Sequence, residues 1–193
     1  MTIPTHAHSP LVIERFCALC DRAHECWLNH LELFDGNSRN TEFLESVIKD
    51  EWMRLFAISQ EYSLLQIVKL HDPAVMNNNI TLGIEYVFTY GNWSASVRDR
   101  LTTQKKKLDV LANKLRGVRN KILSHNDFAT ILDEATLGAF DEGTDTQYFA
   151  ALQEFVNIVH DQVIGGEYPF CSLVKSDAAF FLRSINPISL KEN

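Results

Sequence analysis

The sequence predicts an all-α protein, an up-and-down bundle of four to five main helices, and three observations support this fold class. Apolar residues recur at helical spacing over most of the 193 residues. No segment shows the sustained alternation of apolar and polar residues that is typical of strands joined by hairpin turns. No repeat or low-complexity linker divides the chain. We therefore expect one helical domain over 1–193, with a flexible leader at 1–9, a loop at 130–146 and a C-terminal extension at 167–193.

Two long helices are expected in the first half. The first begins at Ser9-Pro10, with Ser as the cap and Pro at the first helical position, and runs to Phe34. A turn rich in Gly and Asn follows. The second helix carries apolar residues at helical spacing from Phe43 onward and ends at His71-Asp72-Pro73. A shorter helix is expected between Thr81, its cap, and Tyr90.

The fourth expected helix has the clearest pattern in the chain. Ser94 caps it, and it runs to about Ser124. Its apolar side chains alternate spacings of four and three, broken by one Gln, which is typical of helices that pack in bundles. This stripe consists of Val97, Leu101, Gln104, Leu108, Leu111, Leu115, Val118 and Ile122.

Two further helices complete the predicted bundle. Apolar residues from Tyr148 to Val163 predict an amphipathic helix that stops at Gly165-Gly166. A short terminal helix is expected at 177–185.

Composition excludes some classes of protein. The formal net charge is -7 and the isoelectric point is about 5.5, which excludes a protein that holds nucleic acid through overall positive charge. No apolar run is long enough to suggest a membrane span, and the first ten residues lack the pattern of a secretory signal. We therefore expect a soluble, cytoplasmic protein whose four cysteines are reduced thiols.

Basic residues are concentrated in the fourth predicted helix. Nine Lys and Arg but only two acidic residues lie between Arg98 and Lys121. Such a run can be a solvated face that pairs with acidic neighbours, or a groove that binds the phosphates of a polyanion. If it binds RNA, the candidate ligands are Lys105, Lys106, Lys107, Lys114, Arg116 and Lys121.

A His and an Arg follow at the end of this helix. Continuing the stripe by three residues from Ile122 places His125 on the side that faces a neighbouring helix, with Arg119 beside it. One interpretation is a half-buried core histidine and an arginine that binds a helix-end carbonyl or a carboxylate. The other is a site for RNA cleavage, because His transfers protons near neutral pH and Arg binds a phosphoryl group through two hydrogen bonds.

The residues around His125 resemble those of a known family. Arg119-Asn120-Lys121 followed by Ser124-His125-Asn126-Asp127 is similar to the signature of the HEPN superfamily, and most closely to its abortive-infection U-type (AbiU2-like) proteins. Val68 to Pro73 and Ile80 to Leu82 extend the resemblance to about residues 40–130. Ser124 stands where that group usually has Ala.

The resemblance implies a metal-independent endoribonuclease that acts as a toxin or a phage-defence effector. Arg119 would stabilise the phosphoryl transition state, His125 would act as acid or base, Asn120 would orient the phosphate or Arg119, and Ser124 would be accessory. The resemblance also implies a homodimer, and an antitoxin or nucleotidyltransferase as a further partner. It requires no cofactor and no metal.

The chemistry of cleavage favours a dimer for a separate reason. Attack by the ribose hydroxyl needs one group that accepts a proton and one that donates a proton, but the motif offers a single His per chain. A two-fold axis beside His125 would bring two such residues into one cleft.

Two other interpretations remain. The protein could be a non-catalytic HEPN-like interaction module, in which the same residues hold the dimer seam or a partner nucleotidyltransferase. It could also be a purely structural helical protein with no role in nucleic-acid binding. Cys17, Cys20 and His24 share a face of the first helix, but small thiols commonly fill bundle cores, so we expect no metal site there. Asp72 is expected to be a turn residue.

Overall fold

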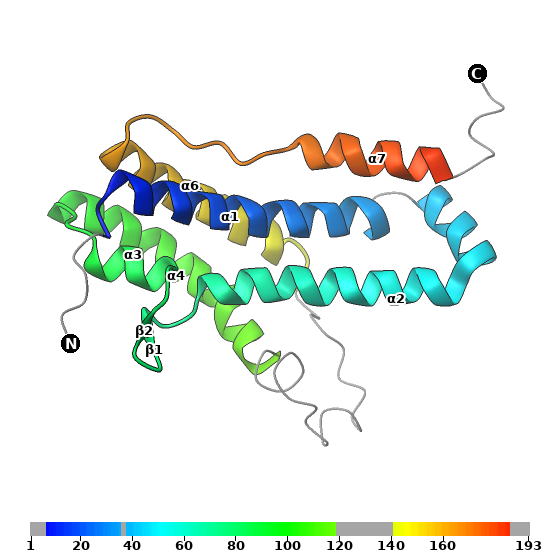
Figure 1. Cartoon of the computed structure of the whole chain (residues 1–193), viewed down its shortest axis with the longest axis horizontal. Helices are drawn as coiled ribbons and strands as arrows, with labels where there is room; N and C mark the ends of the chain where they lie inside the picture. Colours follow the sequence, from blue (N-terminus) through cyan, green and yellow to red (C-terminus); the bar gives the residue numbers. More distant parts are fainter. Residues whose placement is uncertain (1–6, 36–37, 119–140, 186–193) are drawn as a thin grey trace.

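We describe the fold from a computed structural model, which describes residues 7–35, 38–118 and 141–185 (Figure 1). The predicted all-α class is confirmed. The elements are, in order, α1 (Pro10–His30), the π-helical turn η1 (Leu31–Asp35), α2 (Ser38–Leu70), β1 (Val75–Met76), β2 (Asn79–Ile80), α3 (Ile84–Tyr90), α4 (Ala95–Val118), α6 (Thr144–Val163) and α7 (Leu173–Ile185). None of these helices is long and apolar enough to cross a bilayer.

The start of α1 is the one that the sequence predicts. The Ser9 hydroxyl accepts a hydrogen bond from the amide of Val12 at 3.4 Å, and Pro10 occupies the first turn. Just before it, Ala7 is buried and the His8 ring lies 4.8 Å from that of Trp93. The last residues of the predicted leader therefore pack against the bundle.

The first helix reaches its predicted end at Phe34 because its last turn is π-helical rather than α-helical. The wider turn η1 continues α1 and brings Phe34 between Trp52, at 4.7 Å between ring centroids, and Phe56, at 5.4 Å. Helix α2 in turn has one non-helical residue, Ile48, with φ -136° and ψ 40°. The straight part of α2 therefore begins after Ile48, a break that its apolar pattern did not indicate.

The segment between α2 and α3 contains a small hairpin that the sequence did not predict. Val75 pairs with Ile80 and Met76 with Asn79, in antiparallel register. The turn uses Asn77 and Asn78, both at positive φ, a conformation that Asn tolerates and that suits two-residue hairpins.

The predicted cap of the third helix was wrong. Thr81 donates its amide to Ala74 across the hairpin, and Gly83 precedes the first residue of α3 instead. A Cβ at Gly83 would lie 2.7 Å from the carbonyl oxygen of Leu70, so the close approach of these backbones requires glycine.

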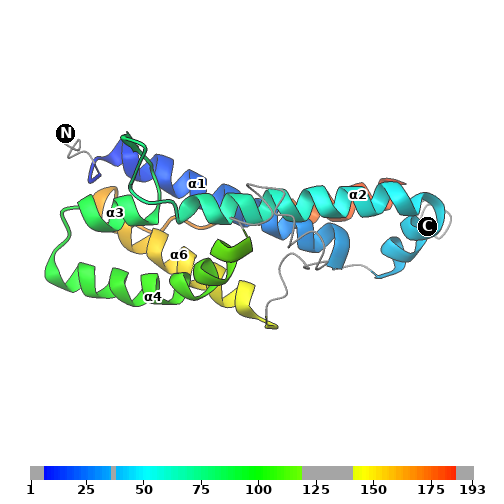
Figure 2. The same cartoon turned by 90° about the horizontal axis from the view of Figure 1, so that it is seen from below.

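Helix α1 lies at the centre of the bundle and contacts α2, α6 and α7 (Figures 1 and 2). Helices α4 and α6 run antiparallel along each other (Figure 2). Helix α6 ends as predicted, because Gly165 and Gly166 both adopt positive φ. Helix α7, within the predicted C-terminal extension, begins four residues earlier than expected and packs against α1 and η1.

Candidate functional site

The predicted catalytic residues lie outside the described residues. These are Arg119, Asn120, Ser124 and His125, and Lys121 lies outside as well. The described part of α4 ends at Val118, immediately before the motif. The roles of these residues, and the cleft into which Arg119 and His125 are expected to open, therefore stay predictions. The structure does describe the helix that leads to them.

The stripe on α4 faces the core, as its spacing predicts. Its members Val97, Leu101, Leu108, Leu111 and Leu115 are all buried. Helix α6 covers this face, and its Leu152 and Phe155 belong to the same buried cluster. The polar member of the stripe is Gln104, whose buried Oε1 has no hydrogen-bond partner in the described part of the chain. Packing on α6 therefore fixes the direction in which α4 approaches the motif.

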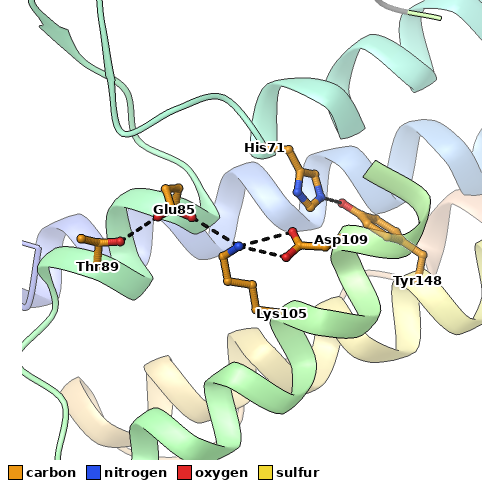
Figure 3. Close-up of polar contacts among 6 residues, drawn as sticks. All are labelled: His71, Glu85, Thr89, Lys105, Asp109 and Tyr148. Carbon is orange, nitrogen blue, oxygen red and sulfur yellow. Dashed lines mark hydrogen bonds and ion pairs between the residues drawn. The ribbon is translucent and has the colours of Figure 1, made fainter. Parts of the chain in front are cut away.

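Lys105 lies inward rather than in solvent (Figure 3). Its Nζ is 3.0 Å from Asp109 Oδ2, one helical turn away, and 3.3 Å from Glu85 Oε2 on α3. Partial burial acts to lower the pKa of the ammonium, but Asp109 and Glu85 outweigh it and the pKa is raised. Glu85 also accepts a hydrogen bond from Thr89 at 2.9 Å. Lys105 thus joins α3 to α4 and would have to leave two carboxylates to bind a phosphate.

Three other basic residues of α4 also have partners. Lys114 lies 2.7 Å from Asp141, and this hydrogen bond lowers the pKa of the Asp141 carboxyl. Arg100 pairs with Glu154 on α6 at 3.4 Å. The Arg98 guanidinium lies 5.5 Å from the centre of the Phe88 ring. These contacts are those expected of a basic face that pairs with neighbouring groups.

Lys106 and Lys107 differ from these residues. Both are exposed, and no carboxylate of the described residues forms an ion pair with either. Lys107 also borders a cavity of about 460 Å³ between α4 and α6, whose apolar wall includes Val110 and Ala151. Among the predicted RNA ligands whose side chains are described, Lys106 and Lys107 can bind a phosphate without losing an ion pair. The side chain of Arg116 lies outside the described part of the chain.

A second polar contact connects α2 to α6. His71 Nε2 and the Tyr148 hydroxyl lie 2.9 Å apart (Figure 3). Burial raises the pKa of Tyr148 well above its ordinary value, so the phenol is neutral at physiological pH. His71 also lines a cavity of about 210 Å³ with Glu85, Lys105 and Asp109. Because these residues are far apart in the sequence, only the Lys105–Asp109 spacing of four could have indicated part of this cluster.

The cluster lies away from the motif. Lys105 precedes Val118, the last described residue of α4, by about 20 Å along the helix axis. We therefore interpret the contacts of Figure 3 as attachments between helices, of α3 to α4 and of the end of α2 to α6, rather than as reacting groups. Asp72, at the end of α2, is buried at the turn where the sequence predicts a turn residue.

The thiols of α1 are poorly suited to chemistry. Burial raises the pKa of Cys17 from its ordinary value of 9.0 to about 12, and raises that of Cys20 as well. His24 stacks on Phe170 at 5.2 Å, and burial lowers its pKa. Within the described ranges no three His, Cys, Asp or Glu residues are grouped so that they could hold a metal ion.

Comparison with known proteins identifies the family. The HEPN_AbiU2 family, described as AbiU2, matches residues 10–179, from the first turn of α1 into α7. No curated protein and no solved structure matches the chain. The matched segment covers most of the 193 residues and includes the Arg119 to His125 motif. The chain therefore belongs to the HEPN AbiU2 family.

Proposed function

We propose that the protein is a metal-independent HEPN endoribonuclease that acts in the cytoplasm as a toxin or a phage-defence effector. The observation that carries this proposal is the family match over 10–179, because it includes an Arg and a His at the spacing of RNA-cleaving HEPN proteins. The buried stripe of α4 supports it, since α4 is packed against α6 up to Leu115, four residues before Arg119 in the sequence.

In this mechanism Arg119 stabilises the charge that develops on the phosphoryl oxygens, and His125 transfers a proton. Asn120 orients the phosphate or Arg119, and Ser124 is accessory. The ribose 2′-hydroxyl attacks the phosphorus and the 5′-oxygen of the next nucleotide leaves, which produces a 2′,3′-cyclic phosphate. One His accepts the first proton and the other donates the second, so the active form is a homodimer with its two-fold axis beside His125.

Substrate binding would use the free part of the basic face. Lys106 and Lys107 are exposed and have no ion pair within the described chain, so they can bind phosphates without first breaking an ion pair. The net charge of -7 favours a local contact of this kind over general attraction to nucleic acid.

The test is cleavage of mixed-sequence single-stranded RNA in EDTA by the wild type and by Arg119→Ala, His125→Ala and Arg15→Ala. Arg15 is an exposed residue of α1 and serves as the matched control. We expect the wild type and Arg15→Ala to leave cyclic phosphates. We expect each motif variant to lose about two to four orders of magnitude in rate. Equal cleavage by all four proteins would indicate a contaminating nuclease, and no cleavage by the wild type would contradict the proposal.

One observation favours a second function, a non-catalytic module that binds a partner protein such as an antitoxin or a nucleotidyltransferase. Arg100, Lys105 and Lys114 are each paired with a carboxylate, which reduces the positive potential that RNA would meet on α4. If this function holds, the wild type will neither cleave nor bind RNA at low salt. Retention of salt-sensitive RNA binding would exclude it.

A further inference from the structure

Helices α4 and α6 leave a cavity between them, the one that Lys107 borders, and we call it the α4–α6 pocket (Figure 2). Its volume of about 460 Å³ is in the range of sites that hold small molecules. Its floor is apolar, because Leu111 and Ala151 line it and are each 3% exposed. Val110, 57% exposed, and Ala150 lie at its mouth. The short side chains of the two alanines leave room for a flat ring against these apolar walls.

One polar group in the α4–α6 pocket lacks a partner. Gln104 stands in the stripe of α4 between Leu101 and Leu108, which are both fully buried. Its side chain lines the pocket, and its Oε1 is buried without a hydrogen-bond donor in the described part of the chain. A buried acceptor without a donor is unfavourable, and an apolar side chain at this position would pack α4 on α6 without that cost. The amide therefore indicates a ligand that brings an N–H group to Oε1.

The mouth of the pocket carries a positive charge. Lys107 is exposed there and forms no ion pair within the described chain. The acidic residue of the lining, Glu154, pairs with Arg100 at 3.4 Å, so these two charges offset each other. Gln104 and Lys107 are three residues apart and lie on the same face of α4, about 4.5 Å apart along the helix axis. A small ligand with an N–H donor on a ring and an anionic group can therefore reach both.

We propose that the α4–α6 pocket binds an adenine nucleotide, either free or within a single strand of nucleic acid. The exocyclic amino group of adenine donates a hydrogen bond to Gln104 Oε1, and Gln104 Nε2 donates one to the adjacent ring nitrogen, which is the pairing that glutamine makes with adenine. The base lies against Val110, Leu111 and Ala151, and the phosphate lies on Lys107.

The same contacts discriminate against the other bases. Guanine and uracil present a carbonyl oxygen where adenine presents its amino group, so Gln104 Oε1 would face a second acceptor. Cytosine has an amino group but only one ring, so it would cover less of the apolar wall than adenine does. Size and hydrogen bonding together therefore select adenine.

Binding in this pocket is separable from cleavage. The lining contains none of the motif residues, and Lys107 precedes Val118, the last described residue of α4, by about 16 Å along the helix axis. For a nucleotide within a strand, the proposal rests on the proposed function and specifies how the nuclease holds its substrate. A deoxyribonucleotide strand lacks the hydroxyl that would attack, so its binding can be measured whether or not the protein cleaves RNA.

The test is isothermal titration calorimetry of the full chain with AMP, IMP and CMP. IMP matches AMP in size and charge but has a carbonyl in place of the amino group, so we expect it to bind about tenfold or more weakly. We expect CMP to bind more weakly than AMP as well. Gln104→Leu should abolish the preference for AMP over IMP and should unfold at no lower urea concentration than the wild type, because it removes an unpaired buried acceptor. Gln60→Leu, at a half-buried position of α2, is the control and should keep the preference.

The phosphate contact is tested by Lys107→Gln, which should weaken AMP but not adenosine. Lys106→Gln is the control, because Lys106 is equally exposed but does not line the pocket. Hexamers of oligo(dA) and oligo(dT) distinguish the two sources of the nucleotide. Tighter binding of oligo(dA) than of AMP and of oligo(dT) would assign a strand, whereas AMP binding at least as tightly as oligo(dA) would assign a free nucleotide.

Three results would overturn the proposal. The first is that neither AMP nor oligo(dA) binds at millimolar concentration. The second is that IMP or CMP binds as tightly as AMP. The third is that folded Gln104→Leu, checked by circular dichroism, keeps the preference for AMP over IMP.

Discussion

The double variant Lys106→Gln/Lys107→Gln separates the free lysines of α4 from the paired ones. Each phosphate contact to a single strand contributes about 0.7 to the slope of log affinity against log salt, so loss of two contacts should reduce that slope by about 1.4. Between 50 and 200 mM salt the wild type should therefore lose about sevenfold more affinity than the variant does. The expectation follows from the exposure of both side chains and from their lack of an ion pair within the described chain.

The matched control is Lys105→Gln, one residue away on the same helix. Because Lys105 is held by Asp109 and Glu85, its loss should leave the salt slope unchanged. It should instead lower the free energy of unfolding by about 0.5–1 kcal/mol, since two partly exposed carboxylates lose their counter-charge. Fluorescence anisotropy with labelled RNA at several salt concentrations gives the slopes, and urea titration gives the stabilities. Equal changes in slope for Lys105→Gln and for the double variant would refute the reasoning.

Three further predictions concern the bundle itself. Tyr148→Phe, which removes the hydroxyl that contacts His71, should lower the unfolding free energy by about 1 kcal/mol in urea; no change would mean that this contact is absent in solution. Leu108→Ala should cost about 2–5 kcal/mol in the same titration, because Leu108 is fully buried, and a cost below 1 kcal/mol would argue against the α4–α6 core. From pH 9 to 11 the unfolding free energy should fall, because the Cys17 thiol ionises near 9 when unfolded but near 12 when folded, so the unfolded chain binds fewer protons. Cys17→Ala should flatten that pH dependence, and an identical dependence would exclude the thiol as its cause.

The sequence was most informative where one physical effect dominated. The stripe of α4 predicted its buried face, because the spacing of apolar residues and the packing of helices follow the same period. Ser9 and Ser94 were predicted as caps, and each hydroxyl does accept an amide hydrogen bond at its helix start. The glycines after α6 were predicted to end it because few other residues adopt positive φ.

Prediction failed where the outcome depended on contacts distant in the sequence. Leu55 and Tyr62 share the helical spacing of the second helix with Trp52, but Trp52 is buried and the other two are exposed. Period alone cannot tell which of two apolar stripes a neighbouring helix covers. Likewise the basic run did not reveal that Lys105 meets Glu85, twenty positions earlier, because that contact exists only when α3 lies beside α4.

The basic residues of α4 fall into a group with partners in the fold and a group that can bind substrate. Arg98, Arg100, Lys105 and Lys114 attach α4 to α3, to α6 and to the residues before α6, so four of the six basic residues of α4 whose side chains are described have partners within the chain. Two free lysines contribute only about 1.4 to a salt slope, which corresponds to weak electrostatic binding by one copy. Two copies that bind one RNA would double this contribution. In the proposed homodimer, the second copy would supply a second His and a second pair of exposed lysines, so it would serve substrate binding as well as catalysis.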